Sequence, residues 1–197
     1  MVSLGGTASY HEDMFPQHLP LAERQLLASK YTALPAEFKS KTGDEVVTPD
    51  NFDKWFATHI NLSVRWVLQE QFSGSGRLSL TAHQQQLPVL FPVDLRYGWD
   101  LRQHDHRNNL DLVRERFKPL VKFSSPDCRL WTAMTNTKPT SEVNTDRKKE
   151  LPMLEWLYGD NCQQAKLGLG YINENGLRSQ IWTQSPLRKT VIFMATK

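Results

Sequence analysis

Cysteine is scarce in this chain, which has two, Cys128 and Cys162, among 197 residues. So few cysteines exclude a fold held together by disulfides, and they predict a reducing, intracellular setting. No group of Cys and His has the spacing typical of a zinc site, so we expect no metal. His104 and His106 lie two residues apart, but a charged loop is the simpler interpretation of that pair.

Long apolar runs are also missing. No stretch approaches the ~18 consecutive apolar residues of a membrane-spanning helix. The opening residues, MVSLGGTASYHEDMF, lack the basic start and apolar stretch of a secretory signal. We therefore expect neither membrane insertion nor secretion. Apolar residues still make up 39% of the chain and aromatic residues 10%, which predicts a folded domain with a substantial core.

Charge of neither sign dominates, and the net charge is only +3. Its distribution is uneven, because residues 1–63 carry a net −3 and residues 64–197 a net +6. A basic surplus confined to one part of a chain is typical of a nucleic-acid partner. An ordinary, mildly basic surface would have the same composition, so both interpretations stay open.

The same boundary separates two kinds of predicted structure. Residues 1–63 are expected to form a helical extension, with one amphipathic helix over 20–31 and another starting at Thr48-Pro49. From residue 64, strand-like and helix-like segments alternate, which predicts an α/β domain over 64–197 with a mostly parallel sheet and helices on both faces. Strands are predicted over 64–71, 88–94, 120–124, 170–174 and 190–195, helices over 77–86, 105–117 and 150–167, and a basic loop over 132–149.

Two glycines follow the first predicted strand, in Glu70-Gln71-Phe72-Ser73-Gly74-Ser75-Gly76. Glycines one residue apart allow a tight turn and a close approach of the backbone to a ligand. The helix start that follows can offer amide groups to a polar or anionic group. A glycine turn without a ligand is also common, but the flanking strand and helix favour a binding role.

Acidic residues follow the second predicted strand. Asp94 lies 20 residues after Gly74, at the edge of a parallel sheet where a carboxylate can accept hydrogen bonds from a ribose diol. A surface carboxylate or a helix cap is the alternative. Asp100 follows on the same edge, and it either binds an adenine amine or caps a turn.

The next two strand ends carry a thiol and a carboxylate. Cys128 ends Ser124-Ser125-Pro126-Asp127-Cys128, and a cysteine on such a loop can act as a nucleophile if its thiolate is stabilised. Isolated cysteines are more often small buried side chains, which is our interpretation of Cys162. Glu174 can donate or relay a proton to a bound base, or it can bond to loop amides.

Four segments in this order, EQFSGSGRLS, VDLRYGWDL, FSSPDC and YINEN, resemble the class I S-adenosylmethionine-dependent methyltransferases. The nearest resemblance is to the DNA cytosine-5 methyltransferases, and the chain is also similar to methyltransferase-like modules of mobile-element polyproteins. The resemblance implies a Rossmann-like fold over 64–197. It also implies that S-adenosyl-L-methionine is bound by Glu70, Phe72, Gly74, Gly76, Asp94 and Asp100.

The resemblance further implies covalent catalysis on an extruded base. Cys128 would attack carbon 6 of cytosine, Glu174 would meet ring nitrogen 3, and carbon 5 would receive the methyl group. The partner would be nucleic acid, DNA in preference to RNA. Its phosphates would be contacted by a basic loop containing Lys138, Arg147, Lys148 and Lys149, for which a solvated loop is the alternative.

Three departures from the family weaken the resemblance. Asp127 stands where the family has proline, which puts a negative charge beside the thiol and near any phosphate. Gly176 replaces an apolar residue of the family's Glu-Asn-Val motif. We also expect the C-terminal strand hairpin, arginine motif and recognition domain of the family to be missing. Two alternatives therefore remain: a degenerate methyltransferase-fold module with a binding or structural role, derived from a mobile element, and an enzyme that uses the same cofactor on another substrate.

Overall fold

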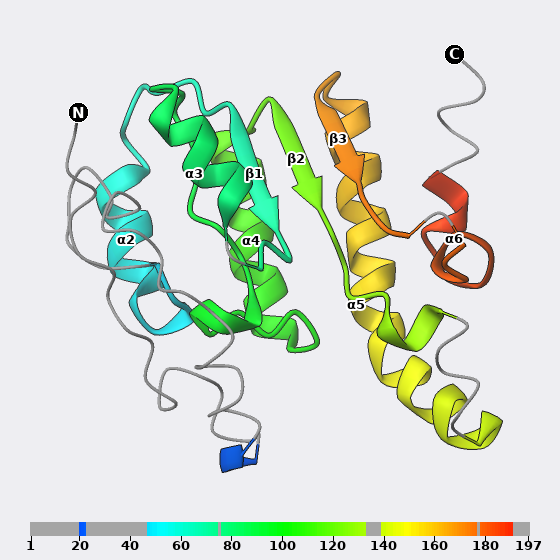
Figure 1. Ribbon diagram of the computed structural model, residues 1–197. Coiled ribbons are helices and arrows are strands. Elements are labelled where there is room, and N and C mark those ends of the chain that lie inside the picture. The colour runs from blue at the N-terminus through cyan, green and yellow to red at the C-terminus, as the bar shows by residue number, and fades with distance from the viewer. Residues whose placement is uncertain (1–19, 23–46, 75, 133–138, 177, 191–197) are drawn as a thin grey trace.

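The computed structural model describes residues 20–22, 47–74, 76–132, 139–176 and 178–190, which form a mixed α/β structure (Figure 1). Its sheet has three short parallel strands: β1 (Leu68–Gln71), β2 (Val121–Ser124) and β3 (Gly170–Asn173). The order is β1-β2-β3, with Leu68 opposite Val121 and Val121 opposite Gly170. A parallel sheet with intervening helices confirms the coarse fold prediction.

The predicted strand over 88–94 is reduced to two isolated bridges. Val89 pairs with Leu68 and Val93 with Gln71, both in parallel. These bridges place the segment along the edge of β1 that β2 does not occupy. The chain therefore adds its second extended segment on one side of β1 and its later strands on the other. Open α/β sheets generally bind ligands at the carboxyl ends of the strands, at the point where the strand order reverses in this way.

Helices cover the two faces of the sheet unequally. Glu70 of β1 bonds to Ser79 of α3 (Arg77–Gln84), so α3 lies on the face to which Glu70 points. Lys122 of β2 points to the opposite face and bonds to Asp160 of α5 (Thr140–Lys166). Asp160 also bonds to Arg114 of α4 (His104–Phe117). Thus α4 and α5 share one face, and Figure 1 shows α5 behind β3.

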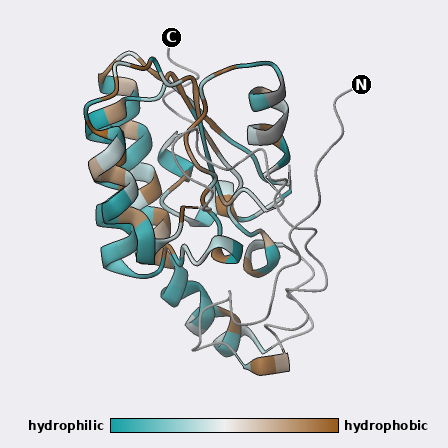
Figure 2. Ribbon diagram, turned by 90° about the vertical axis from the view of Figure 1, so that its left-hand side faces the viewer, coloured by the Kyte–Doolittle hydropathy of each residue, from teal (hydrophilic) through white to brown (hydrophobic). Residues whose placement is uncertain are grey.

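The face beneath α4 and α5 is polar as well as buried. Gln69, Gln71, Lys122 and Ser124 all point to it, and each is almost fully buried. Arg114, Asp160, Asn161 and Gln164 meet them from the helices. Figure 2 shows hydrophilic and hydrophobic residues mixed along the helices, and these buried polar residues belong to the packed side of this layer. Ion pairs and hydrogen bonds therefore have to hold this layer together.

An aromatic cluster joins the first described helix to the α/β part. The 3₁₀ turn η3 (Pro49–Asn51) leads into α2 (Phe52–His59). Phe52 meets Trp99 edge-on with ring centroids 5.8 Å apart, and Trp55 meets Phe91 edge-on at 4.7 Å. These rings belong to one continuous core, so α2 packs as part of the body of the domain.

The longest helix begins earlier than predicted. α5 starts at Thr140, whereas the sequence predicted a loop through residue 149 and a helix from residue 150. The loop prediction over 140–149 was therefore wrong. Among residues 140–149 only Val143 is fully buried, so this stretch has almost no apolar periodicity to reveal a helix.

The two ends of the chain lie largely outside the described residues. Leu21 and Ala22 are helical, but the rest of the predicted helix over 23–31 is outside the described part. Of the predicted strand over 190–195, Thr190 is helical instead, and 191–195 are not described. The short helix α6 (Ile181–Gln184) precedes it. Within the described ranges, no helix has the length and apolar content needed to cross a bilayer.

Gly98 offers a test of the packing between η3 and the rest of the domain. It has a φ of +85°, and an added Cβ would lie 3.2 Å from Cδ of Pro49. We expect Gly98→Ala to lower the free energy of unfolding by about 1–2 kcal/mol, because an L residue is strained there. Gly159→Ala, in α5 with open space around it, should instead raise it by up to about 1 kcal/mol. Urea unfolding of both variants checks this, and equal midpoints would contradict it.

Candidate functional site at the carboxyl ends of the strands

Three residues of the loop after β1 have a left-handed backbone conformation. Phe72, Gly74 and Gly76 have φ values of 54°, 53° and 65°. The Gly76 amide donates to the Ser73 carbonyl oxygen at 2.8 Å, and Gly76 forms the N-cap of α3. A Cβ added at Gly74 would meet no atom within 4 Å. The space beside Gly74 is therefore free of other atoms of the described residues, and a ligand there stays a prediction.

Asp94 and Tyr97 hold this loop in place. Asp94 Oδ2 accepts a hydrogen bond from the Gly74 amide at 2.8 Å, and the Tyr97 hydroxyl donates to the Gly74 carbonyl oxygen at 3.2 Å. Asp94 Oδ1 also accepts from the Arg96 amide at 3.0 Å, which caps η4 (Leu95–Tyr97). Burial raises the pKa of Asp94, and the two amide bonds oppose that rise. A carboxylate can accept about four hydrogen bonds, so Asp94 retains capacity for a ligand hydroxyl.

Glu70 and Asp100 are bonded within the protein. Glu70 Oε2 accepts from the amide of Ser79 at 2.8 Å and from its hydroxyl at 2.6 Å, so Glu70 anchors α3. Burial raises the pKa of Glu70. Asp100 forms a two-pronged ion pair with Arg102, using Oδ1 toward Nε at 2.8 Å and Oδ2 toward Nη2 at 2.9 Å. The cofactor-binding roles of Glu70 and Asp100 stay predictions. A cofactor would have to share these carboxylates with Ser79 and Arg102, or replace the hydrogen bonds that they form.

Cys128 lies on the loop after β2. It is a half-buried free thiol outside the hydrophobic core, at the start of η5 (Arg129–Trp131). The neighbouring Asp127 is paired, since Oδ1 accepts from the Arg129 amide at 2.8 Å and Oδ2 from Arg129 Nε at 2.5 Å. This pairing counters the charge that Asp127 places beside the thiol, although both partners are well exposed and water screens the attraction.

The loops after β2 and β3 are bonded to each other at three points. The Ser125 hydroxyl donates to Glu174 Oε2 at 2.5 Å. The Glu174 amide donates to the Ser124 carbonyl oxygen at 2.8 Å, and Asn175 Nδ2 donates to the Pro126 carbonyl oxygen at 2.7 Å. Glu174 is thus bound to a residue three positions before Cys128. The structure brings together the two loops that the sequence predicted would face one crevice.

The predicted basic residues differ from one another in their contacts. Arg147 Nε donates to the Leu130 carbonyl oxygen at 2.8 Å, its Nη groups donate to Gln180 and Gln184 next to and within α6, and its guanidinium lies 4.9 Å from the Trp131 ring centre. Arg147 therefore ties α5, η5 and α6 together. Lys149 bonds to Asp146 at 2.9 Å, and Lys148 is exposed. Lys138 lies outside the described residues.

Protein-family models, curated proteins and solved structures were compared with this chain, and none matched. The chemistry of the site is therefore inferred from its own residues. These residues are Cys128 with its half-buried thiol, Glu174 on the neighbouring loop, the glycine turn after β1, and Asp94, whose carboxylate accepts a hydrogen bond from that turn.

The sequence did not identify several residues that lie at the carboxyl ends of the strands. Ser73 is 9% exposed and Gln71 is fully buried, yet Ser73 Oγ and Gln71 Nε2 have no hydrogen-bond partner among the described residues. Buried polar atoms without partners are rare in proteins, and others occur in the described part at Trp66, Gln69, Asn161 and Gln164. Glu150 was also missed, although it accepts from Trp131 Nε1 at 2.7 Å and its pKa is raised by burial and by Asp127. No spacing pattern marks these residues, because their roles depend on contacts distant in sequence.

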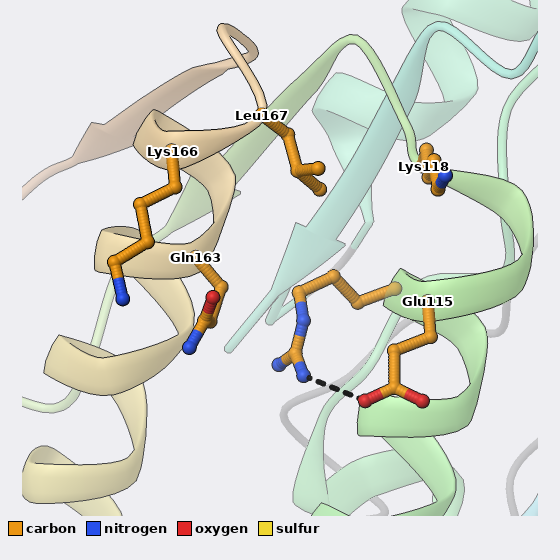
Figure 3. A pocket seen from close by; sticks show the side chains of 6 residues that line it. Glu115, Lys118, Gln163, Lys166 and Leu167 are labelled. Atoms are coloured by element: carbon orange, nitrogen blue, oxygen red, sulfur yellow. Dashed lines mark hydrogen bonds and ion pairs between the residues drawn. The ribbon is translucent and has the colours of Figure 1, made fainter.

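A cleft of about 430 Å³ lies at the amino ends of the strands, at the opposite end of the sheet from the candidate site (Figure 3). Lys166 and Gln163 line it from α5, and Lys118 lines it from the end of α4. Both helices end there, so their carbonyl groups give the cleft partial negative charge, which Lys118 and Lys166 offset. This accounts for its basic side chains without a ligand, and we place the candidate site at the carboxyl ends of the strands.

Proposed function

We propose that the chain is an S-adenosyl-L-methionine-dependent methyltransferase-like protein that acts on cytosine in nucleic acid, preferring DNA, through Cys128. The observation that supports this most is the joining of the Cys128 and Glu174 loops by the Ser125 hydrogen bond. The loop after β2 and the glycine turn after β1 flank the strand reversal, and the loop after β3 lies next to the loop after β2. A nucleophile and a proton-carrying group at one edge of such a sheet suit covalent chemistry on a bound base.

The residues present fit a cofactor with polar groups. Gly74 has open space around it, Asp94 retains acceptor capacity, and the buried Ser73 hydroxyl lacks an acceptor among the described residues. S-adenosyl-L-methionine would supply a transferable methyl group when bound. The Ser73 hydroxyl would donate to its polar end, Gly74 and Gly76 would leave room for its close approach, and Asp94 would accept from its ribose hydroxyls.

The chain's own residues would act on the base. Cys128 Sγ would form a bond to carbon 6 of cytosine, which makes carbon 5 nucleophilic. Glu174 would hold a proton at ring nitrogen 3, so that the negative charge arising on the ring is neutralised. Once carbon 5 is substituted, water would take the carbon 5 proton, the bond between Cys128 Sγ and carbon 6 would break, and the proton at ring nitrogen 3 would return to Glu174, which restores the aromatic ring.

Gly74→Ala tests the cofactor part of this proposal. The added methyl group would occupy the open space at Gly74, and we expect S-adenosyl-L-methionine to bind about tenfold more weakly, or ~1.4 kcal/mol, by titration calorimetry. Gly168→Ala is the matched control, because Gly168 also has a positive φ of +70° and open surroundings but lies after α5, at the opposite edge. The control should bind like the wild type. No binding heat in the wild type, with either the cofactor or its demethylated product, would refute the enzymatic proposal.

A degenerate module with a binding or structural role is the second candidate. The pairing of Asp100 with Arg102 favours it, because both oxygens of the carboxylate predicted to meet adenine are already engaged. The negative charge of Asp127 beside Cys128 also favours this candidate, because it disfavours the thiolate that a nucleophile needs. This candidate predicts no covalent adduct with cytosine analogues. An enzyme acting on another substrate would bind the cofactor and also form no such adduct.

A further inference from the structure

Ser125 lies in the FSSPDC segment, but the sequence assigned it no role of its own. Its hydroxyl donates to Glu174 Oε2 at 2.5 Å, which is within the 2.5–2.7 Å typical of a hydroxyl bonded to a carboxylate. Such bonds are stronger than those between neutral groups. Glu174 is otherwise exposed, so without this bond its flexible side chain would sample several rotamers.

The backbone fixes Ser125 independently of its side chain. The Ser125 amide donates to the Gln71 carbonyl oxygen at 3.2 Å, which joins it to the end of β1. The Glu174 amide and the Asn175 side chain hold the β3 loop to Ser124 and Pro126. The loops therefore stay joined when the Ser125 hydroxyl is removed, and only the Glu174 carboxylate is released.

We infer that Ser125 is a positioning residue that fixes the Glu174 carboxyl group toward the base attacked by Cys128. This inference rests on the proposed function. Glu174 Oε2 accepts a hydrogen bond from the Ser125 hydroxyl, which directs that oxygen toward the β2 loop. No hydrogen bond engages Oε1 within the described ranges, so that oxygen is left to meet ring nitrogen 3. Ser125 thereby selects both the rotamer of Glu174 and the oxygen that faces the base.

The test compares Ser125→Ala and Ser125→Thr in the full chain. The measured quantity is the rate of covalent adduct formation with a DNA oligonucleotide containing 5-fluorocytosine, in the presence of S-adenosyl-L-methionine, between pH 5.5 and 9. Releasing the Glu174 side chain from its fixed rotamer is expected to slow the reaction of Ser125→Ala about tenfold or more and to change the shape of its pH profile. Ser125→Thr, which keeps the hydroxyl, should restore the rate to within about threefold and restore the profile.

Cofactor affinity and the thermal unfolding midpoint are measured alongside, and both should stay at wild-type values in Ser125→Ala. A wild-type rate and pH profile in Ser125→Ala would overturn the inference while leaving the proposed function standing. So would equal losses in both variants together with a lower unfolding midpoint. If the wild type forms no adduct, the proposed function fails, and the role of Ser125 falls with it.

Discussion

Cys128→Ser is expected to abolish covalent capture of a 5-fluorocytosine oligonucleotide. Serine is nearly the same size, but its hydroxyl is far less nucleophilic than a thiol near neutral pH. Removing a nucleophile typically lowers the rate by ~10³-fold or more, so no adduct should be visible by denaturing electrophoresis. Cofactor binding should be unchanged, because Cys128 lies on the β2 loop and not on the glycine turn.

Cys162→Ser is the control for this result. Cys162 is also a half-buried free thiol, but it lies within α5. The control should form the adduct at the wild-type rate. Adduct formation by Cys128→Ser, or its loss in Cys162→Ser alone, would show that Cys128 is not the nucleophile.

Asp160→Ala is expected to destabilise the fold more than any surface change. The Asp160 side chain is fully buried and bonds to both Lys122 and Arg114, and the Lys122 side chain is 1% exposed. Removing one partner of a buried ion pair leaves uncompensated charge and typically costs about 3–5 kcal/mol. A domain has only about 5–15 kcal/mol in total, so a large part of the stability should disappear in urea unfolding.

The pH dependence of this variant separates a charge effect from a cavity effect. Burial already lowers the pKa of Lys122, and Asp160 opposes that shift. Without Asp160 the pKa of Lys122 should fall further, so the folded state binds fewer protons than the unfolded chain. The free energy of unfolding should then rise with pH toward the ordinary lysine pKa of 10.5.

The exposed pair of Lys149 and Asp146, 2.9 Å apart, provides the control. Asp146→Ala should change stability by less than about 1 kcal/mol, as is usual for surface ion pairs. A loss below 1 kcal/mol in Asp160→Ala would contradict the role given to the buried network. Replacing Lys122 and Asp160 together with Met and Leu should recover much of the loss, because well-packed apolar residues can substitute for a buried pair.

The sequence predicted those elements in which apolar residues recur with the period of a helix or of a strand. The helix predicted over 105–117 is α4, and the strands predicted over 120–124 and 170–174 are β2 and β3 to within a residue at each end. The strand predicted over 64–71 is shorter, since β1 begins at Leu68. The start of α5 was missed because its first ten residues are mostly exposed and carry little periodicity.

Strand ends could be placed at one edge from sequence, but side-chain partners could not. Parallel pairing puts the residues after β2 and β3 side by side, which is why Cys128 and Glu174 were expected to share a crevice. The bond from Ser125 to Glu174 spans 49 residues and depends on the register of the two strands. The ion pair between Asp100 and Arg102 is local and could have been predicted, because an acid and an arginine two residues apart in a turn commonly form an ion pair.

The contacts of Arg147 have a consequence for how the protein opens. Arg147 and Trp131 join η5 to α6, and the Gln180 amide adds a bond of 2.6 Å to the Trp131 carbonyl oxygen. The loop carrying Cys128 and the four-residue α6 are therefore expected to exchange their amide hydrogens together, as one cooperative unit of low stability. The strands beneath should exchange far more slowly. Local opening of this unit would then expose the loop that carries Cys128 while the sheet stays folded.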